Sequence, residues 1–203
     1  MCIRDRKYGL DQVRYFLLRE VPFGNDGDFS KNSMINRINS DLSNDLGNLC
    51  QRVLSFVQKN CDASIPQNNG FSKDDERLIA QVYGVLPSLR ADINSQSFNV
   101  ALERIWSIVS ASNKYIDEQA PWKLRKTKPE RMQTVLFTLM ETIRCIGILL
   151  QPVMPASANE ILNQLTIDPS DRSFSALNEE HCLQSGAKLQ QPNPIFPRFD
   201  EKT

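Results

Sequence analysis

Apolar residues recur at intervals of three and four through several long stretches of this 203-residue sequence. Because an α-helix turns once in about 3.6 residues, this spacing gathers the apolar side chains on one face of each helix. The pattern predicts an all-α protein, an antiparallel helical bundle in which these faces meet in one core. The clearest faces are Ile35, Ile38, Leu42, Leu46, Leu49, Val53 and Phe56, then Leu102, Ile105, Val109 and Ile116, then Val135, Leu139, Ile143, Ile146 and Leu150.

Prolines and polar capping residues set the predicted helix boundaries. Ser72 with Asp75 three residues later resembles a capping box, and the other paired acids fall at helix starts or in polar loops. No apolar run approaches the length of a membrane span. Beyond Asp168 the chain is expected to be extended or irregular. The predicted helices are 10–20, 30–60, 72–94 with a disturbance at Pro87, 97–118, 129–150 and 156–165.

Trp122 follows a proline that ends a predicted helix, in the order Asp-Glu-Gln-Ala-Pro-Trp. A basic run comes next, and an aromatic ring beside cations suits an unpaired nucleobase with its phosphates. The alternative is a tryptophan that caps the helical core, with a solvated basic loop behind it. On spacing alone the alternative is preferred, because tryptophan is largely buried on average. The run consists of Lys123, Arg125, Lys126, Lys128 and Arg131.

Asn44, Asn48 and Arg52 recur every four residues and therefore share one helix face. Leu46 lies on the opposite face, so this row points away from the core. Asparagine is a poor residue for a helix interior, and two in one row need a reason. Hydrogen bonding to base edges is one reason, since asparagine and arginine offer paired donors or acceptors. An ordinary solvated polar face is the other.

Five blocks of the sequence, in order, resemble the C-terminal part of bacterial methionyl-tRNA synthetases. The resemblance extends from Tyr8 to Asp200 and is weakest between Ile167 and Pro194. Its most specific pieces are EQAPW and the NxxxNxxxR row. The blocks are YGLDQVRYFLLREVPFGNDGDFS, INSDLSNDLGNLCQR, ASNKYIDEQAPW, LLQPVMPASANEIL and IFPRFD.

This resemblance implies a class I synthetase anticodon-binding domain that recognises the CAU anticodon of methionine tRNA, as part of an ATP-dependent methionine-tRNA ligase. The expected organisation is an unmatched start plus a remnant of the stem-contact linker (1–29), the helical anticodon-binding domain (30–165) and an irregular tail (166–203). The implied anticodon contacts are Asn44, Asn48, Arg52 and Trp122, with the wobble cytosine on Trp122. The possible phosphate contacts are Lys123, Arg125 and Lys126.

The resemblance places the catalytic domain, with its ATP-gripping loop, before Tyr8. The sequence contains no HIGH-like motif, no GxGxxG and no P-loop. We therefore expect no catalytic residues and no cofactor in this fragment, which should be inactive alone, and ATP with Mg²⁺ in the full-length enzyme. Met1 to Arg6 match nothing in the family and are expected to be the foreign start of a truncated gene.

Acidic and basic residues balance at 24 each, so no global field favours nucleic acid and any RNA contact must be local. The expected partners are methionine tRNA and the missing catalytic domain, with no DNA and no membrane. The five cysteines form no CxxC pair, which indicates free thiols in a reducing cytoplasm and no metal site. The competing functions are a helical protein-interaction module without RNA binding, and the anticodon domain of another class I synthetase, against which EQAPW argues.

The last apolar segment of the chain, from about Asn193 to Asp200, is expected to be docked on the protein. Ile195, Phe196, Pro197 and Phe199 are too apolar for a free end. The alternative is a partly loose tail, because in the family this end folds back toward the catalytic part, which is missing here.

Overall fold

The computed structural model describes residues 8–22, 24 and 30–199, and the long elements within them are all helices. The all-α prediction is confirmed. Met1 to Arg6, the expected foreign start, lie outside the described residues. The helices are α2 (Leu10–Glu20), α3 (Lys31–Arg37), η1 (Ile38–Gly47), α4 (Asn48–Asn60), α5 (Lys73–Tyr83), α6 (Leu86–Asn94), α7 (Phe98–Gln119), α8 (Pro121–Thr127), α9 (Pro129–Leu150) and α10 (Pro155–Gln164).

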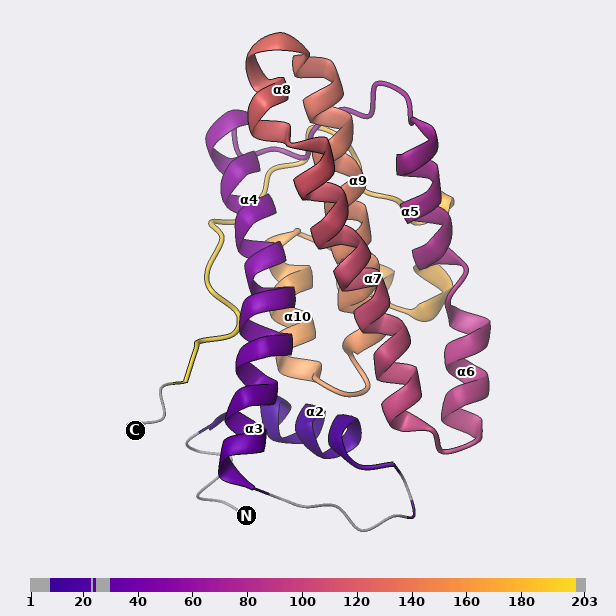
Figure 1. Cartoon of the computed structure of the whole chain (residues 1–203). Coiled ribbons are helices and arrows are strands. Elements are labelled where there is room, and N and C mark those ends of the chain that lie inside the picture. Colours follow the sequence, from indigo (N-terminus) through magenta and orange to yellow (C-terminus); the bar gives the residue numbers. More distant parts are fainter. Residues whose placement is uncertain (1–7, 23, 25–29, 200–203) are drawn as a thin grey trace.

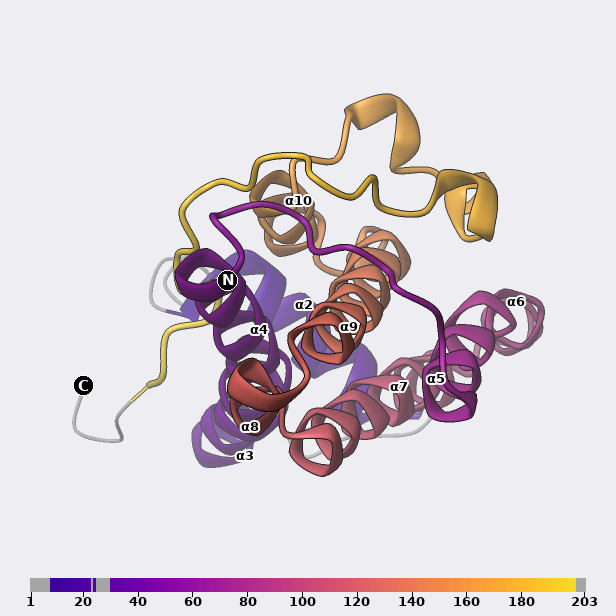
Figure 2. The ribbon, with the colours of Figure 1, turned by 90° about the horizontal axis from the view of Figure 1, so that it is seen from above.

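Helix α9 occupies the centre of the bundle, and α4, α5, α7, α8 and α10 surround it (Figures 1 and 2). Because it has neighbours on all sides, its polar residues are buried with its apolar ones, including Thr138, Glu141 and Arg144. The single apolar face predicted for this helix is therefore only part of its buried surface. By length and composition α9 could also cross a membrane, contrary to prediction, but 94% of its most apolar window is buried inside the protein. That burial is typical of a core helix.

The predicted helix over 30–60 is confirmed as one continuous rod of α3, η1 and α4 (Figure 1). Ser30 caps it, since its hydroxyl accepts a hydrogen bond of 3.0 Å from the Ser33 N–H. Between Ile38 and Gly47 the turns are wider, and the Asn48 N–H reaches back five residues to the Ser43 carbonyl. Such π-helical turns often mark functional sites.

The predicted helix over 72–94 is broken completely, into α5 and α6, with Pro87 in the first turn of the second piece. The capping box is present, because the Ser72 N–H donates to Asp75 over 2.7 Å. Asp75 has a larger role than that cap. Its fully buried carboxylate also accepts hydrogen bonds from the Tyr115 hydroxyl and from the guanidinium of Arg131. Asp75 therefore joins α5 to α7 and α9.

Helix α7 ends at Gln119, as the proline predicted, but the following basic stretch, which lies outside the predicted helices, is also a helix. Ala120 forms the corner with a left-handed backbone, φ 43°. Proline excludes the right-handed helical conformation from the residue before it, so α7 cannot continue. Pro121 then starts α8, because a proline at the first helical position loses no hydrogen bond.

The chain after α10 is irregular apart from short 3₁₀ turns, as predicted, and it covers one side of the bundle (Figure 2). It pairs briefly with the loop after α4, where the Ile65 N–H donates to the Ala187 carbonyl over 2.9 Å. Further on it follows α4 and α3, and Phe196 is only 6% exposed. The prediction that the apolar end is docked is confirmed for the described residues.

Candidate nucleic-acid interface

Arg52 connects the two groups of residues that the sequence singled out. Its Nη2 lies 2.6 Å from Oδ1 of Asp117, near the end of α7. Its guanidinium carbon lies 5.7 Å from the centre of the Trp122 ring, within the range of a cation–π contact. Arg52 on α4 thus contacts Trp122 on α8.

Trp122 is 43% exposed, whereas Trp106 on α7 is 7% exposed and belongs to the core. The interpretation of Trp122 as a core residue is therefore wrong. A large exposed aromatic ring with a cation beside it is suited to stacking with an unpaired base.

The side chains of Asn44 and Asn48 are exposed, Arg52 is half-buried, and Leu46 on the opposite face is fully buried. The predicted direction of the row is confirmed. Neither asparagine amide has a hydrogen-bond partner within the part of the chain that the structure describes. Both line a shallow pocket of about 450 Å³, which we call the amide pocket; its walls include Asn44, Asn48 and Gln51 from the helix and Pro194, Ile195 and Phe196 from the tail.

The basic residues near Trp122 divide into two groups. Lys123 and Lys126 are exposed on α8, and their side chains make no hydrogen bond or ion pair with the described residues. Arg125 donates to Oδ1 of Asn60 over 3.0 Å and so also ties α8 to the end of α4. Arg131, the last of the run, is held by Asp75 and is not available to a ligand.

Sequence reasoning missed three parts of this site. Asp117 was quoted only as part of a motif, although it holds Arg52. Gln51 follows Asn48 by three residues, and that helical spacing could have revealed it. The tail residues of the amide pocket gave no such signal, because nothing in the sequence indicates that residues about 150 positions apart lie together.

The titratable groups offer no catalytic arrangement in the described part of the chain. Burial raises the pKa of the Cys50 thiol to about 12 and that of Cys61 to about 11, so neither is a nucleophile at neutral pH. The described residues contain no cluster of three or more histidine, cysteine or acidic side chains that could hold a metal.

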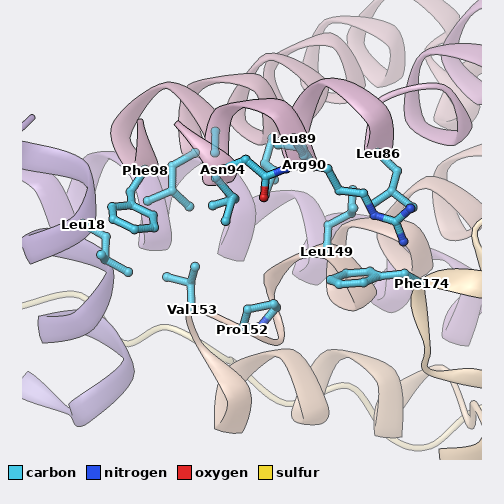
Figure 3. Close-up of a pocket in the computed structure, with 14 residues that line it drawn as sticks. Leu18, Leu86, Leu89, Arg90, Asn94, Phe98, Leu149, Pro152, Val153 and Phe174 are labelled. Carbon is cyan, nitrogen blue, oxygen red and sulfur yellow. The ribbon is translucent and has the colours of Figure 1, made fainter. Parts of the chain in front are cut away.

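A second pocket lies away from these residues, between α2, α6, α7 and the turn after α9 (Figure 3). Its volume is about 210 Å³. The lining is apolar except for Arg90 and Asn94, with Phe98, Leu149 and Phe174 among the walls. It contains none of the predicted site residues and has few groups to read a base edge.

Family models match both parts of the chain. Residues 3–54 match a family described as tRNA synthetases class I (M), and residues 65–203 match the anticodon binding domain of methionyl tRNA ligase. The expectation that Met1 to Arg6 match nothing in the family is therefore wrong from residue 3 onward. These matches define a class I aminoacyl-tRNA synthetase sequence with an anticodon-binding domain.

The curated relatives of the chain indicate the same family. The chain is 44% identical to methionine–tRNA ligase of Brucella suis biovar 1 over 96% of its own length and 38% of that protein, and 45% identical to that of Mycobacterium bovis over 94% and 37%. The chain belongs to the methionyl-tRNA synthetase family. It spans less than two fifths of the length of these relatives. Neither a protein-interaction module nor the domain of another synthetase is favoured.

Solved structures give the same result for the fold. The apo form of Mycobacterium tuberculosis methionyl-tRNA synthetase superposes with a TM-score of 0.94 at 43% identity, covering 98% of this chain and 40% of that one. The same enzyme in complex with methionyl-adenylate gives 0.93 at 44% identity, covering 97% and 39%.

Proposed function

We propose that this chain is the part of a methionine–tRNA ligase that reads the CAU anticodon of methionine tRNA. The observation that carries the proposal is the exposed ring of Trp122 beside Arg52, at the end of the row of Asn44 and Asn48. The family match supports tRNA as the partner.

In this mechanism the wobble cytosine leaves its stack and lies on the free face of Trp122. Stacking of that kind contributes about 1–3 kcal/mol per base and tolerates any base, so it provides affinity. Identity comes from the guanidinium of Arg52 and the amides of the row, which hydrogen-bond a base edge. A wrong base leaves those groups unpaired, and unpaired polar groups at a contact are costly.

Lys123 and Lys126 follow Trp122 on α8 and face solvent, where phosphates of the loop would pass. A lysine acts there as a point charge that holds any RNA backbone. Arg125 contributes its charge from its place beside Asn60.

The joining of methionine to tRNA with ATP is proposed for the whole protein. A relative of known structure holds methionyl-adenylate, and ATP with Mg²⁺ would be bound by the catalytic part of such an enzyme. This chain carries no catalytic group for that step in our proposal, and alone it should support no methionine-dependent ATP–pyrophosphate exchange. The proposed setting is the cytoplasm, without DNA or membrane partners.

The test replaces Trp122 by alanine and by phenylalanine and measures binding to a methionine anticodon stem-loop in moderate salt. We expect Trp122→Ala to weaken binding by about 1–3 kcal/mol with the bundle still folded, and Trp122→Phe to lose less. Asn48→Ala should instead narrow the preference for CAU over altered anticodons. If Trp122→Ala and Asn48→Ala both bind the methionine anticodon stem-loop like the parent, and circular dichroism shows that both are folded, the proposed function is refuted.

A further inference from the structure

The pocket of Figure 3, which we call the apolar pocket, lies at the end of the bundle opposite α8 (Figure 1). Leu102, Ile105 and Leu149 form buried parts of its wall. Ile93 and Phe174 also line it, and they are 45% and 37% exposed. Large apolar side chains that are exposed singly need no explanation, but two of them at one apolar cavity mark a surface that a ligand can cover.

Hydrogen bonds outside the apolar pocket hold its walls in place. Arg14 on α2 donates to the carbonyls of Pro152 and Val153, over 2.9 and 2.8 Å, and so fixes the turn after α9. Gln151 donates to the carbonyl of Arg172 over 2.6 Å and fixes the segment that leads to the aromatic wall. The cavity is therefore present before a ligand arrives, and binding does not have to pay for opening it.

Arg90 alone carries a charge among the described residues that line the apolar pocket. Its side chain is exposed, and in Figure 3 it extends toward Leu86, on the side of the pocket where Phe174 lies. It makes no hydrogen bond or ion pair with the described residues. Asp92, the acid of the same helix, is held by Arg104, with 3.3 Å between Oδ1 and Nη2. A guanidinium without a carboxylate partner thus lies at the edge of an apolar cavity.

The size and charge of the apolar pocket select one class of ligand. A guanidinium binds a carboxylate through two parallel hydrogen bonds. The described lining contains no acidic side chain, so the ammonium group of a free amino acid would have no partner there. The volume is about 210 Å³. A protein cavity of about 150 Å³ holds benzene, so one ring with a short chain fits.

We propose that the apolar pocket binds a small monocarboxylate with an apolar body, such as an aryl-substituted short-chain acid. Its carboxylate pairs with Arg90, and its apolar part lies between Ile93, Phe98 and Phe174. Burial of the apolar part provides most of the affinity, and the guanidinium determines which charge the ligand carries. The inference is independent of the proposed RNA binding, which uses the other end of the bundle (Figure 1).

The experiment titrates hydrocinnamate, a phenyl ring on a short carboxylic acid, into the 203-residue chain and follows the backbone amides by NMR. We expect saturable shifts at Ile93, Phe98 and Phe174, with a dissociation constant on the order of 1 mM, and none at Asn48. Hydrocinnamyl alcohol has a similar shape without the charge and should bind about fivefold more weakly. The proposal is overturned if the pocket residues show no saturable shift, or if the alcohol binds as tightly as the acid.

Two variants separate the role of the charge from that of the wall. Arg90→Gln should weaken hydrocinnamate about fivefold and leave the alcohol unchanged, with the parent's unfolding midpoint, because this exposed side chain has no described partner to lose. The matched control is Arg77→Gln, an exposed arginine on α5 outside the pocket, which should bind both compounds like the parent. Phe174→Ala removes an aromatic wall and should weaken both compounds about fivefold. Parent-like binding of the acid by either Arg90→Gln or Phe174→Ala contradicts the proposed site.

Discussion

Two arginine–carboxylate pairs of this protein differ mainly in their exposure to water. In the Arg52–Asp117 pair the side chains are 32% and 63% exposed, and the arginine faces Trp122. In the Arg144–Glu141 pair both side chains are 1% exposed, inside the bundle. The first pair is at the proposed interface, and the second lies on the central helix.

The partners of the buried pair explain why it is permanent. Glu141 also accepts from the Tyr83 hydroxyl over 2.7 Å and from the Leu183 N–H over 3.0 Å, and Arg144 donates to the Ala176 carbonyl over 2.9 Å. Separating charges that are buried and fully hydrogen-bonded leaves one of them unpaired in a medium that solvates it poorly. An exposed pair contributes at most about 1 kcal/mol, so a ligand can replace one partner at little cost. Exposure therefore separates arginines that hold the fold from arginines that can bind.

The largest expected effect comes from removing one partner of the buried pair. Arg144→Met should lower the free energy of unfolding by about 3–5 kcal/mol, because Glu141 loses its counter-charge in the core. Urea denaturation followed by circular dichroism measures the change. A loss below about 1 kcal/mol would show that the buried pair is no more important than a surface one. The fraction that remains folded should bind the stem-loop like the parent.

A smaller effect is expected at Asp75, whose pair with Arg131 is buried on the carboxylate side only. Burial raises the pKa of Asp75, but hydrogen bonds from Arg131, Tyr115 and Ser72 outweigh it, and the net pKa lies below the ordinary value of 3.8. A carboxyl with a lowered folded-state pKa stabilises the protein fully above its unfolded pKa, and this stability is lost as pH falls through the folded pKa.

Asp75→Asn should accordingly cost about 1–3 kcal/mol at neutral pH. Below the ordinary pKa of 3.8 the difference between variant and parent should shrink as pH falls toward and through the lowered folded-state pKa of Asp75, where the parent carboxyl also becomes protonated. Urea unfolding at several pH values checks both statements. A difference that stays constant down to pH 2 would mean that the ion pair does not contribute.

At the exposed pair, Asp117→Asn should change the free energy of unfolding by no more than about 1 kcal/mol. It should strengthen stem-loop binding a few-fold, since RNA no longer competes with a carboxylate for Arg52 and one repulsive charge is removed. Weaker binding would instead show that Asp117 orients the guanidinium. Asp74→Asn on α5, which removes the exposed partner of Arg77, is the control and should leave RNA binding unchanged.

The smallest effect is expected at Lys126, which has no described partner to lose. Lys126→Ala should leave stability unchanged and weaken cognate and altered stem-loops equally, and the slope of log affinity against log salt should fall by about 1. A change that depends on the anticodon sequence would mean that this lysine contacts a base.

The long helices could be predicted because their apolar spacing is local information. Residues 30–60 and α7 follow directly from stripes that include Leu42 and Ile105. The seven-residue α8 could not, since a helix that short is unstable alone and forms by packing on α9. The burial of α9 beyond its predicted apolar face was missed for a related reason. Charged residues such as Glu141 and Arg144 are usually exposed, and only the folded chain supplies the partners that let them be buried.

The same limit applies to the site. Asn44, Asn48 and Arg52 were found because a helix places every fourth residue on one face. Trp122 was singled out from the sequence, but its spacing favoured burial. The structure shows instead that its side chain is exposed. The tail wall depends on contacts such as that of Asn39 with Phe199, 160 residues away, which no periodic pattern encodes.

The left-handed corner at Ala120 affects the entropic cost of binding RNA. For alanine this conformation is about 1–2 kcal/mol less favourable than the right-handed one, yet two hydrogen bonds hold it, from its own N–H to Ile116 and from the Lys123 N–H to its carbonyl, over 3.0 and 2.8 Å. Pro121 next to it has a fixed φ. Such a corner has few other conformations, so the indole is already oriented before RNA arrives. The conformational entropy of orienting the indole is then lost when the protein folds. Binding of the RNA loop therefore loses less free energy to ordering the protein.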